Sequence, residues 1–337
     1  MIDKKTVFVL GAGASCPYVY PSGARLREWI CHPEEFVNYK HLWNSVQNIS
    51  EVQVKQFKDA FEKSSIKSID IFMANNPKLA PVGKYIIAFE VFRAESQSCF
   101  GEKAKLQQEE LAYAINHGKF VPRKLLLITL FQGGDWYFYL YNRLIEGLVG
   151  PNALPDFSDG KIAFITFNYD RSLEHFLYES LRNSFTEVSE DRIIQSLSQL
   201  KILHVYGQIA PLKWQNPSDY VDYKPLLSES FLQNTANNIR TIYEQKESPE
   251  LNEARQLLAQ AEQIFFLGFG YAEENLEILK LSDRTKRTSW IYGTAFGLEN
   301  GELNDYRNKI IEWLPVDSSQ RVRVENMDCL KLLRNYF

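Results

Sequence analysis

The stretch Thr6-Val-Phe-Val-Leu10 runs directly into Gly11-Ala-Gly-Ala-Ser15. A short, continuous apolar run predicts a strand that is buried on both faces, as in a parallel sheet. The two glycines after it permit a tight turn and a close approach of the backbone to a ligand. If a helix begins near Ser15, its free N–H groups favour a phosphate. The motif alone is weakly specific, because Cys16 stands where the dinucleotide fingerprint has its third glycine.

Composition places few further limits on the chain. Its 337 residues, 45% hydrophobic and 24% charged, suit one large α/β domain with an insertion, or two domains. The net charge of −4 gives no electrostatic footprint for nucleic acid, so direct nucleic-acid binding is not expected. The four cysteines form no CxxC pair, which argues against a zinc site and a disulfide framework. No signal peptide is recognisable, and we expect a cytoplasmic protein.

Further strand patterns follow only after residue 160. They cover 161–167, 202–206, 264–267, 289–292 and 321–324, and helical patterns at 172–182, 249–261 and 273–280 separate several of them. This alternation predicts an α/β fold with a Rossmann-like, mostly parallel sheet that carries helices on both faces. Ligands bind at the carboxyl ends of the strands in such sheets. The residues expected at those ends are Gly11, Asn168, Gly207, Gly268 and Gly293.

The first strand–helix unit, with its helix at about 24–30, is followed by helical patterns that include 51–63 and 103–116. Because a second strand is expected sooner in a doubly wound fold, we predict a helical insertion after the first βα unit. The expected division is a Rossmann-like domain of residues 1–30 and 160–337 with a helical cap of residues 31–159.

Two segments allow more than one interpretation. The aromatic-rich region 124–150 fits a core helix better than a subunit contact, and its charges (Asp135, Arg143 and Glu146) make a membrane span improbable. The proline-containing segment 208–246 is expected either to drape over the mouth of the pocket or to be an ordinary surface loop.

Polar side chains at two strand ends are candidates for chemistry. Asn168 and Asp170 lie two residues apart after a strand, where they suit helix capping as well as a ribose hydroxyl, a water or a carboxamide. His204 lies near the end of the next strand, where a lone histidine is more often a packed core residue than a general base. Position at the carboxyl ends of the strands is what favours the functional interpretation of both.

The order of Gly11-Ala-Gly-Ala-Ser15, Asn168-x-Asp170, the strand that leads to Gly207 and Gly268-Phe-Gly270 resembles sirtuin-like NAD-binding domains. More closely, it resembles the bacterial sirtuin-like proteins of anti-phage defence, as do Pro21-Ser-Gly23 with Leu26 and Ser68-Ile-Asp-Ile-Phe72. The similarity spans nearly the whole chain. Each motif is short, and only their combination and order are specific.

The resemblance implies a domain that binds NAD in an extended cleft and breaks the nicotinamide–ribose bond. It implies that Asn168 holds the ribose or the attacking water, that Asp170 binds the nicotinamide carboxamide, and that His204 is the catalytic imidazole. For the rest of the cofactor it implies a pyrophosphate cradle and glycines close to the adenosine half. Those cofactor-binding residues are Gly11, Ala12, Gly13, Ser15, Gly207, Gly268, Gly270 and Asn275.

The chain departs from the family pattern in two places. Tyr206 stands directly before Gly207, where the family usually has histidine, so either His204 or Tyr206 is expected to serve the ribose. The zinc-ribbon cysteines of the lysine deacylases are missing, as in the defence branch, and no metal is expected.

The expected function is therefore that of an NAD glycohydrolase that releases nicotinamide and ADP-ribose as a regulated, NAD-depleting effector. The resemblance also implies a regulatory partner, either a HerA-like ATPase or an Argonaute-like protein, and a homo-oligomer. Two alternatives remain at this point: a non-catalytic module that binds NAD or ADP-ribose, and, with less support, an NAD-dependent protein deacylase.

Overall fold

The computed structural model describes residues 2–31, 49–98, 100, 134–225, 229–241, 244, 248–281, 289–314 and 319–337. The predicted helix at 103–116 and residues 124–133 of the apolar region lie outside them. None of the helices within the described ranges has the length and hydrophobicity needed to cross a bilayer.

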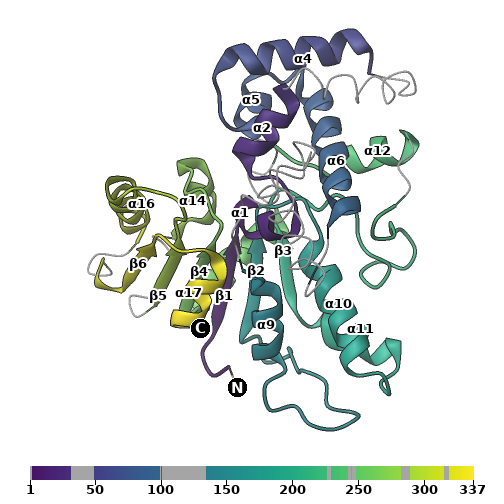
Figure 1. The fold of residues 1–337 in the computed structure, drawn as a ribbon, viewed down its shortest axis with the longest axis vertical. Helices are drawn as coiled ribbons and strands as arrows, with labels where there is room; N and C mark the ends of the chain where they lie inside the picture. The colour runs from purple at the N-terminus through teal and green to yellow at the C-terminus, as the bar shows by residue number, and fades with distance from the viewer. Residues whose placement is uncertain are drawn as a thin grey trace, which may run out of the picture.

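Six strands form one parallel sheet in the order β3-β2-β1-β4-β5-β6 (Figure 1). The strands are β1 (Thr6–Leu10), β2 (Ile162–Thr166), β3 (Lys201–His204), β4 (Gln263–Leu267), β5 (Trp290–Thr294) and β6 (Val322–Glu325). Every residue of β1, β2 and β4 is buried, which explains why continuous apolar runs predicted them. The predicted Rossmann-like α/β fold is confirmed.

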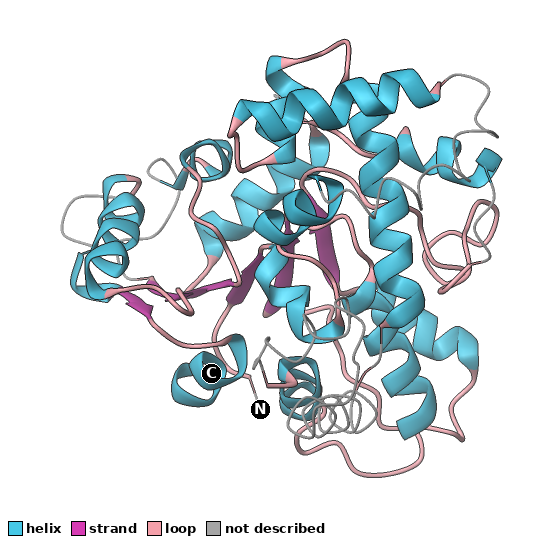
Figure 2. Ribbon diagram, turned by 45° about the horizontal axis from the view of Figure 1, so that its top comes forward, coloured by secondary structure: helices cyan, strands magenta, loops and turns pink. Residues whose placement is uncertain are grey.

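Helices cover both faces of the sheet (Figure 2). Side chains alternate between the faces along a strand, so Lys201 and His204 of β3 point in opposite directions. His204 contacts Glu174 of α10 (Ser172–Ser184), whereas Lys201 pairs with Glu253 of α13 (Pro249–Gln260). The helices α10 and α13 therefore lie on opposite faces.

Aromatic rings form the core of the face that α17 (Cys329–Tyr336) covers. Phe8 stacks on Phe164 and Phe265, with ring centroids 5.1 and 5.4 Å apart, because the parallel register places these residues side by side. Phe337, after α17, contacts Phe8 edge-on at 5.2 Å. These contacts fix the central strands whose ends carry the site.

The helices α2 (Gly23–Cys31), α4 (Glu51–Ser64), α5 (Ile69–Asn75) and α6 (Ala80–Gln97) pack together above the carboxyl ends of the strands (Figure 1). We call these four the cap helices. The helix α2 packs on α4, and α9 (Trp136–Leu144) packs on α10 and α17. The division into a domain of residues 1–30 and 160–337 and a cap of residues 31–159 stays a prediction.

The remaining elements connect the strands or lie at the periphery. They are α1 (Ala12–Ser15), η1 (Cys16–Tyr18), α11 (Glu190–Ser198), α12 (Glu229–Ala236), α14 (Glu273–Leu279), α16 (Asn300–Glu312) and η2 (Ser319–Arg321). The helix α12 lies within the segment expected to be a loop, and it packs against α6.

Candidate functional site

A cavity of about 340 Å³ lies where the carboxyl ends of β1, β2 and β4 meet the cap helices. Its wall combines the loops after these three strands with residues of α2, α5 and α6. We call it the Asn168 cavity. The strand order reverses at β1, and the crevice outside the strands at such a point is where open α/β sheets bind ligands.

Asn168 is held rigidly in this wall. Its Nδ2 donates to the main-chain oxygen of Gly11 and to Oγ of Ser15, each at 3.0 Å. Because a carbonyl oxygen can only accept a hydrogen bond, the bond to Gly11 determines which atom of the Asn168 side-chain amide is Nδ2 and which is Oδ1. The side chain is 8% exposed, and its Oδ1 has no hydrogen-bond partner among the described residues. Such an orphaned acceptor costs about 1–3 kcal/mol, so its presence here indicates a position for a ligand.

Asp170 also lines the Asn168 cavity, and both of its oxygens accept hydrogen bonds. Oδ2 accepts from Oγ of Ser15 at 2.8 Å, and Oδ1 accepts from the main-chain N of Ser172 at 3.1 Å and from the Ser172 hydroxyl. Burial raises the pKa of Asp170, although the hydroxyls of Ser172 and Ser15 oppose this. Ser15 itself is buried behind the cavity wall, where it links the amide to the carboxyl group.

His204 does not line the cavity. Its Nδ1 lies 2.9 Å from the main-chain oxygen of Asn168, and its Nε2 lies 2.6 Å from Oε1 of Glu174. Either His204 or Tyr206 is expected to serve the ribose, and the two lie differently because β3 ends at His204 and the chain turns at residues 205–206. Strand alternation no longer applies across that turn.

Tyr206 is the residue of this pair that lines the cavity. Its hydroxyl donates to Oδ1 of Asn275 at 2.5 Å, and Asn275 lines the cavity as well. Gly207 lies outside it: at φ +86° it turns the chain, and an added Cβ would lie 2.1 Å from the main-chain oxygen of Asn238.

The loops after β1 and β4 pack backbone against backbone. At Gly268, with φ +56°, an added Cβ would lie 1.9 Å from the nitrogen of Ala14. The N–H of Gly11 donates to Leu267 O at 3.0 Å, and that of Gly13 to Gly268 O at 2.9 Å. Two amides of the predicted pyrophosphate cradle are therefore already paired, and α1 is only four residues long. The two packed loops form a narrow wall of backbone atoms.

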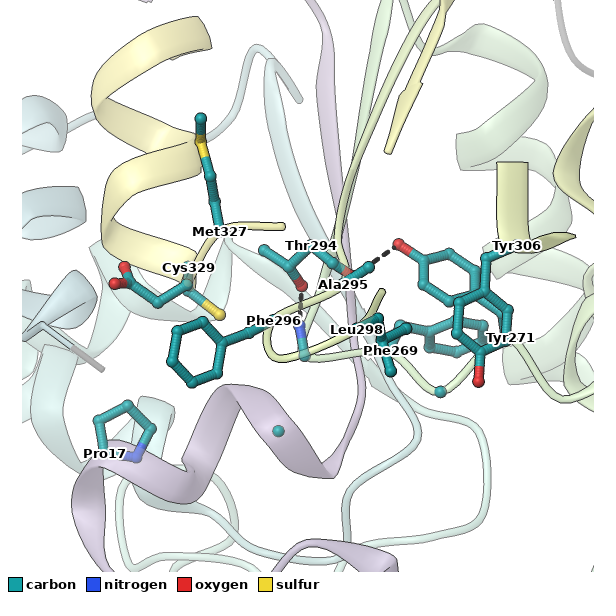
Figure 3. Close-up of a pocket in the computed structure, with 14 residues that line it drawn as sticks. Pro17, Phe269, Tyr271, Thr294, Ala295, Phe296, Leu298, Tyr306, Met327 and Cys329 are labelled. Atoms are coloured by element: carbon teal, nitrogen blue, oxygen red, sulfur yellow. Dashed lines mark hydrogen bonds between the residues drawn. The ribbon is translucent and has the colours of Figure 1, made fainter. Parts of the chain in front are cut away.

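A second cavity, of about 260 Å³, lies on the other side of that wall (Figure 3). It shares Gly13 and residues 268–270 with the first and is lined mainly by apolar and aromatic side chains. Phe296, 51% exposed, stands at this cavity, which we call the Phe296 cavity. The predicted Gly268 and Gly270 thus border both cavities.

Carboxyl groups are the charged side chains of the Asn168 cavity. Its described lining residues include Asp70 and Asp170 but no Lys, Arg or His. Oδ1 of Asp70, on cap helix α5, accepts from the Tyr169 hydroxyl at 2.6 Å, and burial raises the pKa of Asp70. No group of three or more His, Cys, Asp or Glu suited to a metal ion occurs in the described part of the chain.

Arg171, which sequence reasoning did not single out, ties the Asn168 loop to the cap. It is fully buried and makes a bidentate ion pair with Glu95 of α6, with nitrogen–oxygen distances of 2.9 and 3.0 Å. It also donates to the main-chain oxygens of Val221 and Asp222. The segment 208–225, predicted as a pocket cover or a surface loop, is thereby fastened to α6. The position of Arg171 directly after the candidate residue Asp170 is the feature of the sequence that could have identified it.

Comparison with family models, with curated proteins and with solved structures finds no match for this chain.

Proposed function

We propose that the protein is an NAD glycohydrolase that cleaves the nicotinamide–ribose bond to give nicotinamide and ADP-ribose. The observation that carries the proposal is the unpaired Oδ1 of Asn168 in the wall of a cavity at the switch point of the sheet. The resemblance of the motifs to sirtuin-like NAD-binding domains supports it.

NAD would lie across the backbone wall that the two cavities share. The nicotinamide ribose would occupy the Asn168 cavity, and the adenosine half would occupy the more apolar Phe296 cavity. Small-molecule pockets combine an apolar lining with a few fixed polar groups, and Asn168 and Asp170 supply such groups in the Asn168 cavity. Because residues 268–270 border both, the pyrophosphate would pass beside them.

Several features of the Asn168 cavity suit this reaction. Its carboxyl groups favour the cationic nicotinamide ring and the positive charge that develops on the ribose. Cleavage breaks the C–N bond, and its electron pair leaves with nicotinamide. The oxygen of a water forms the new bond at that carbon and releases one proton to the solvent. Nicotinamide is already a cationic leaving group, so no general acid is needed. Asn168 would orient the ribose or the water through its free oxygen.

An enzyme that depletes NAD has to be restrained in its own cell. We propose that it acts in the cytoplasm as an effector of bacterial anti-phage defence and that a protein partner, HerA-like or Argonaute-like, releases its activity. We also propose a homo-oligomer. These proposals rest on the family resemblance alone.

A second candidate is a module that binds NAD or ADP-ribose without cleaving it. The position of His204 favours it, because the expected catalytic imidazole has both ring nitrogens engaged away from the cavity. Tyr206, which takes the position at the cavity, is a poor base, since burial raises its pKa.

Nicotinamide release from NAD, with and without partner and with and without an acylated peptide, tests the proposal. We expect peptide-independent release that Asn168→Ala lowers roughly 10²–10³-fold, the usual effect of losing one oriented dipole. Asn142→Ala is the matched control, because Asn142 is an exposed asparagine whose Nδ2 caps a local carbonyl on α9. Calorimetric binding of NAD without turnover under any condition would establish the second candidate, and peptide-dependent turnover would indicate a deacylase.

A further inference from the structure

We propose that His204 is a positioning residue: as an imidazolium clamped between the Glu174 carboxylate and the main-chain carbonyl of Asn168, it fixes the backbone from which Asn168 reaches its ligand. The inference rests on the proposed function for its effect on turnover, but its structural part stands independently. It gives the histidine a role that acts through Asn168 rather than on the substrate.

The hydrogen-bond geometry requires two donors on the ring. Nδ1 faces the Asn168 carbonyl oxygen at 2.9 Å, and Nε2 faces Oε1 of Glu174 at 2.6 Å. A carbonyl and a carboxylate both accept, and only the protonated ring donates from both nitrogens. Oε1 of Glu174 also accepts from Nε2 of Gln208 at 3.0 Å, which confirms its role as an acceptor in this network.

The charges around the ring favour its cationic form. Glu174 comes from α10, Asp170 follows β2, and Gln208, from the segment after β3, is neutral. On α13, which packs on the same strand, Glu253 is paired with Lys201 at the far end of β3. Burial alone would lower the pKa of His204, but the Glu174 carboxylate and the Asn168 carbonyl outweigh it and raise the pKa.

Deprotonation of the His204 ring would first remove its hydrogen bond to the Asn168 carbonyl. A neutral ring keeps one N–H, and the carboxylate is the stronger acceptor for it. The Nδ1 lone pair would then face the Asn168 carbonyl oxygen, which receives no other hydrogen bond from the described residues. The main-chain N–H of Asn168 is bonded to Thr166, and its side-chain Nδ2 is bonded to Gly11 and Ser15. A shift of the peptide that follows Asn168 would disturb these bonds and move the side-chain amide.

Nuclear magnetic resonance of ring-labelled histidines tests the protonation state directly, with His204→Gln to assign the signal. We expect His204 to titrate above 6.5, the usual value for a histidine, and the Tyr169 amide signal, next to the Asn168 carbonyl, to shift with the same midpoint. His175 is an internal control, because burial beside Arg171 and Lys224 lowers its pKa to about 4 and leaves it neutral at pH 7. A midpoint for His204 at or below 6.5 would overturn the proposal.

The pH dependence of nicotinamide release tests the functional part. We expect activity to fall as pH rises through the His204 titration, and Glu174→Gln to move that fall to lower pH without a matching change in KM. Glu179→Gln makes the same change on an exposed residue of α10 and should leave the profile as in the wild type. His204→Gln should lower kcat by roughly tenfold to a hundredfold with KM little changed, as expected for a misplaced catalytic group.

The outcomes separate this inference from the proposed function. If NAD is hydrolysed but Glu174→Gln and Glu179→Gln have the same pH profile, the positioning role is wrong and the glycohydrolase stands. If NAD is never hydrolysed, the proposed function fails, while the histidine and Tyr169 signals still decide whether the clamp exists. If His204→Gln does not fold, the titration of His204 in the wild-type protein and the pH profile of Glu174→Gln still decide whether His204 is a positioning residue.

Discussion

The two cavities at the carboxyl edge of the sheet share one wall, formed by Gly13 and residues 268–270, and differ in the polar groups that line them. The Asn168 cavity lies beneath the cap helices and contains carboxyl, amide and phenol groups. The Phe296 cavity lies beside β5 and β6 and is lined by rings such as Tyr271, Phe296 and Tyr306 (Figure 3). On the proposed function, the reaction takes place in the Asn168 cavity and the Phe296 cavity binds the adenosine half.

This division has an energetic basis. Binding energy from a part of the substrate that does not react can be used to orient and distort the part that does. In our account the adenosine half supplies this energy in the Phe296 cavity, and the nicotinamide ribose is strained beside Asn168. Four substitutions or conditions distinguish the two regions.

Substitution of the shared wall should damage both cavities. Gly268→Ala would bring a Cβ to within 1.9 Å of Ala14 N at φ +56°, and we expect it to lower the free energy of unfolding by about 3 kcal/mol or more, as measured by urea denaturation. Gly270→Ala is the control from the same loop, because its Cβ would meet nothing within 4 Å. It should leave stability within about 0.5 kcal/mol of the wild type yet weaken NAD binding. Equal stability of both variants would contradict a rigid shared wall.

Acid should weaken the wall of the Asn168 cavity before that of the Phe296 cavity. His175 stacks on Tyr223 at 3.6 Å, and Tyr223 holds the hydroxyl of the cavity residue Tyr20 at 2.8 Å. Burial lowers the pKa of His175 from 6.5 to about 4, so the unfolded chain binds a proton that the folded chain does not between these values. Stability should therefore fall as pH drops through this window, by up to about 3 kcal/mol.

Thermal unfolding from pH 7 to pH 4 measures this loss. His175→Gln should reduce the slope, because it removes the titrating ring. An identical slope in the variant would show that other groups are responsible.

Removal of the exposed ring should affect only the adenosine end. Phe296→Ala should weaken the binding of NAD and ADP-ribose about tenfold, since stacking of a base on an aromatic ring contributes roughly 1–3 kcal/mol. Nicotinamide mononucleotide, which lacks the adenosine, should bind as it does to the wild type. Phe138→Ala removes a similarly exposed ring on α9 and is the control for calorimetry. Equal losses for both ligands would contradict the division.

Neutralising a carboxyl group should affect only the reactive end. Asp70→Asn should reduce the preference for NAD over NADH roughly threefold, because the oxidised ring is cationic and an exposed or half-buried charge interaction contributes at most about 1 kcal/mol. Asp191→Asn, an exposed change at the start of α11, supplies the control. An unchanged preference in Asp70→Asn, measured by competition binding, would exclude Asp70 as a recognition group.

Much of the fold was predictable because burial on both faces leaves a plain signature. β1, β2 and β4 are continuous apolar runs, and caps such as Ser50 and Ser248 delimit α4 and α13 close to the expected bounds. The helix α6 was not assigned individually, because it is buried on most sides and carries no amphipathic stripe. Within α6, the two buried carboxylates Glu90 and Glu95 made the segment look more polar than its environment is.

The candidate site was predictable only where it depended on strand order. Asn168, Asp170 and Gly268 converge because parallel strands bring their carboxyl ends to one edge. The sequence left open whether His204 or Tyr206 lines the cavity, because β3 ends between these residues and the alternation of faces along the strand ends there. The contact of Asp70 with Tyr169 depends on how the cap sits on the sheet, which no local pattern encodes.

The most direct test of NAD binding across the two cavities is a crystal structure of the wild-type protein with an NAD analogue whose nicotinamide ribose carries carbon in place of the ring oxygen, so that it is not hydrolysed. We predict nicotinamide and its ribose within hydrogen-bond distance of Asn168 Oδ1, adenine against Phe296, and the pyrophosphate beside residues 268–270. An analogue bound in the reverse orientation, confined to one cavity, or bound elsewhere on the protein would contradict the account.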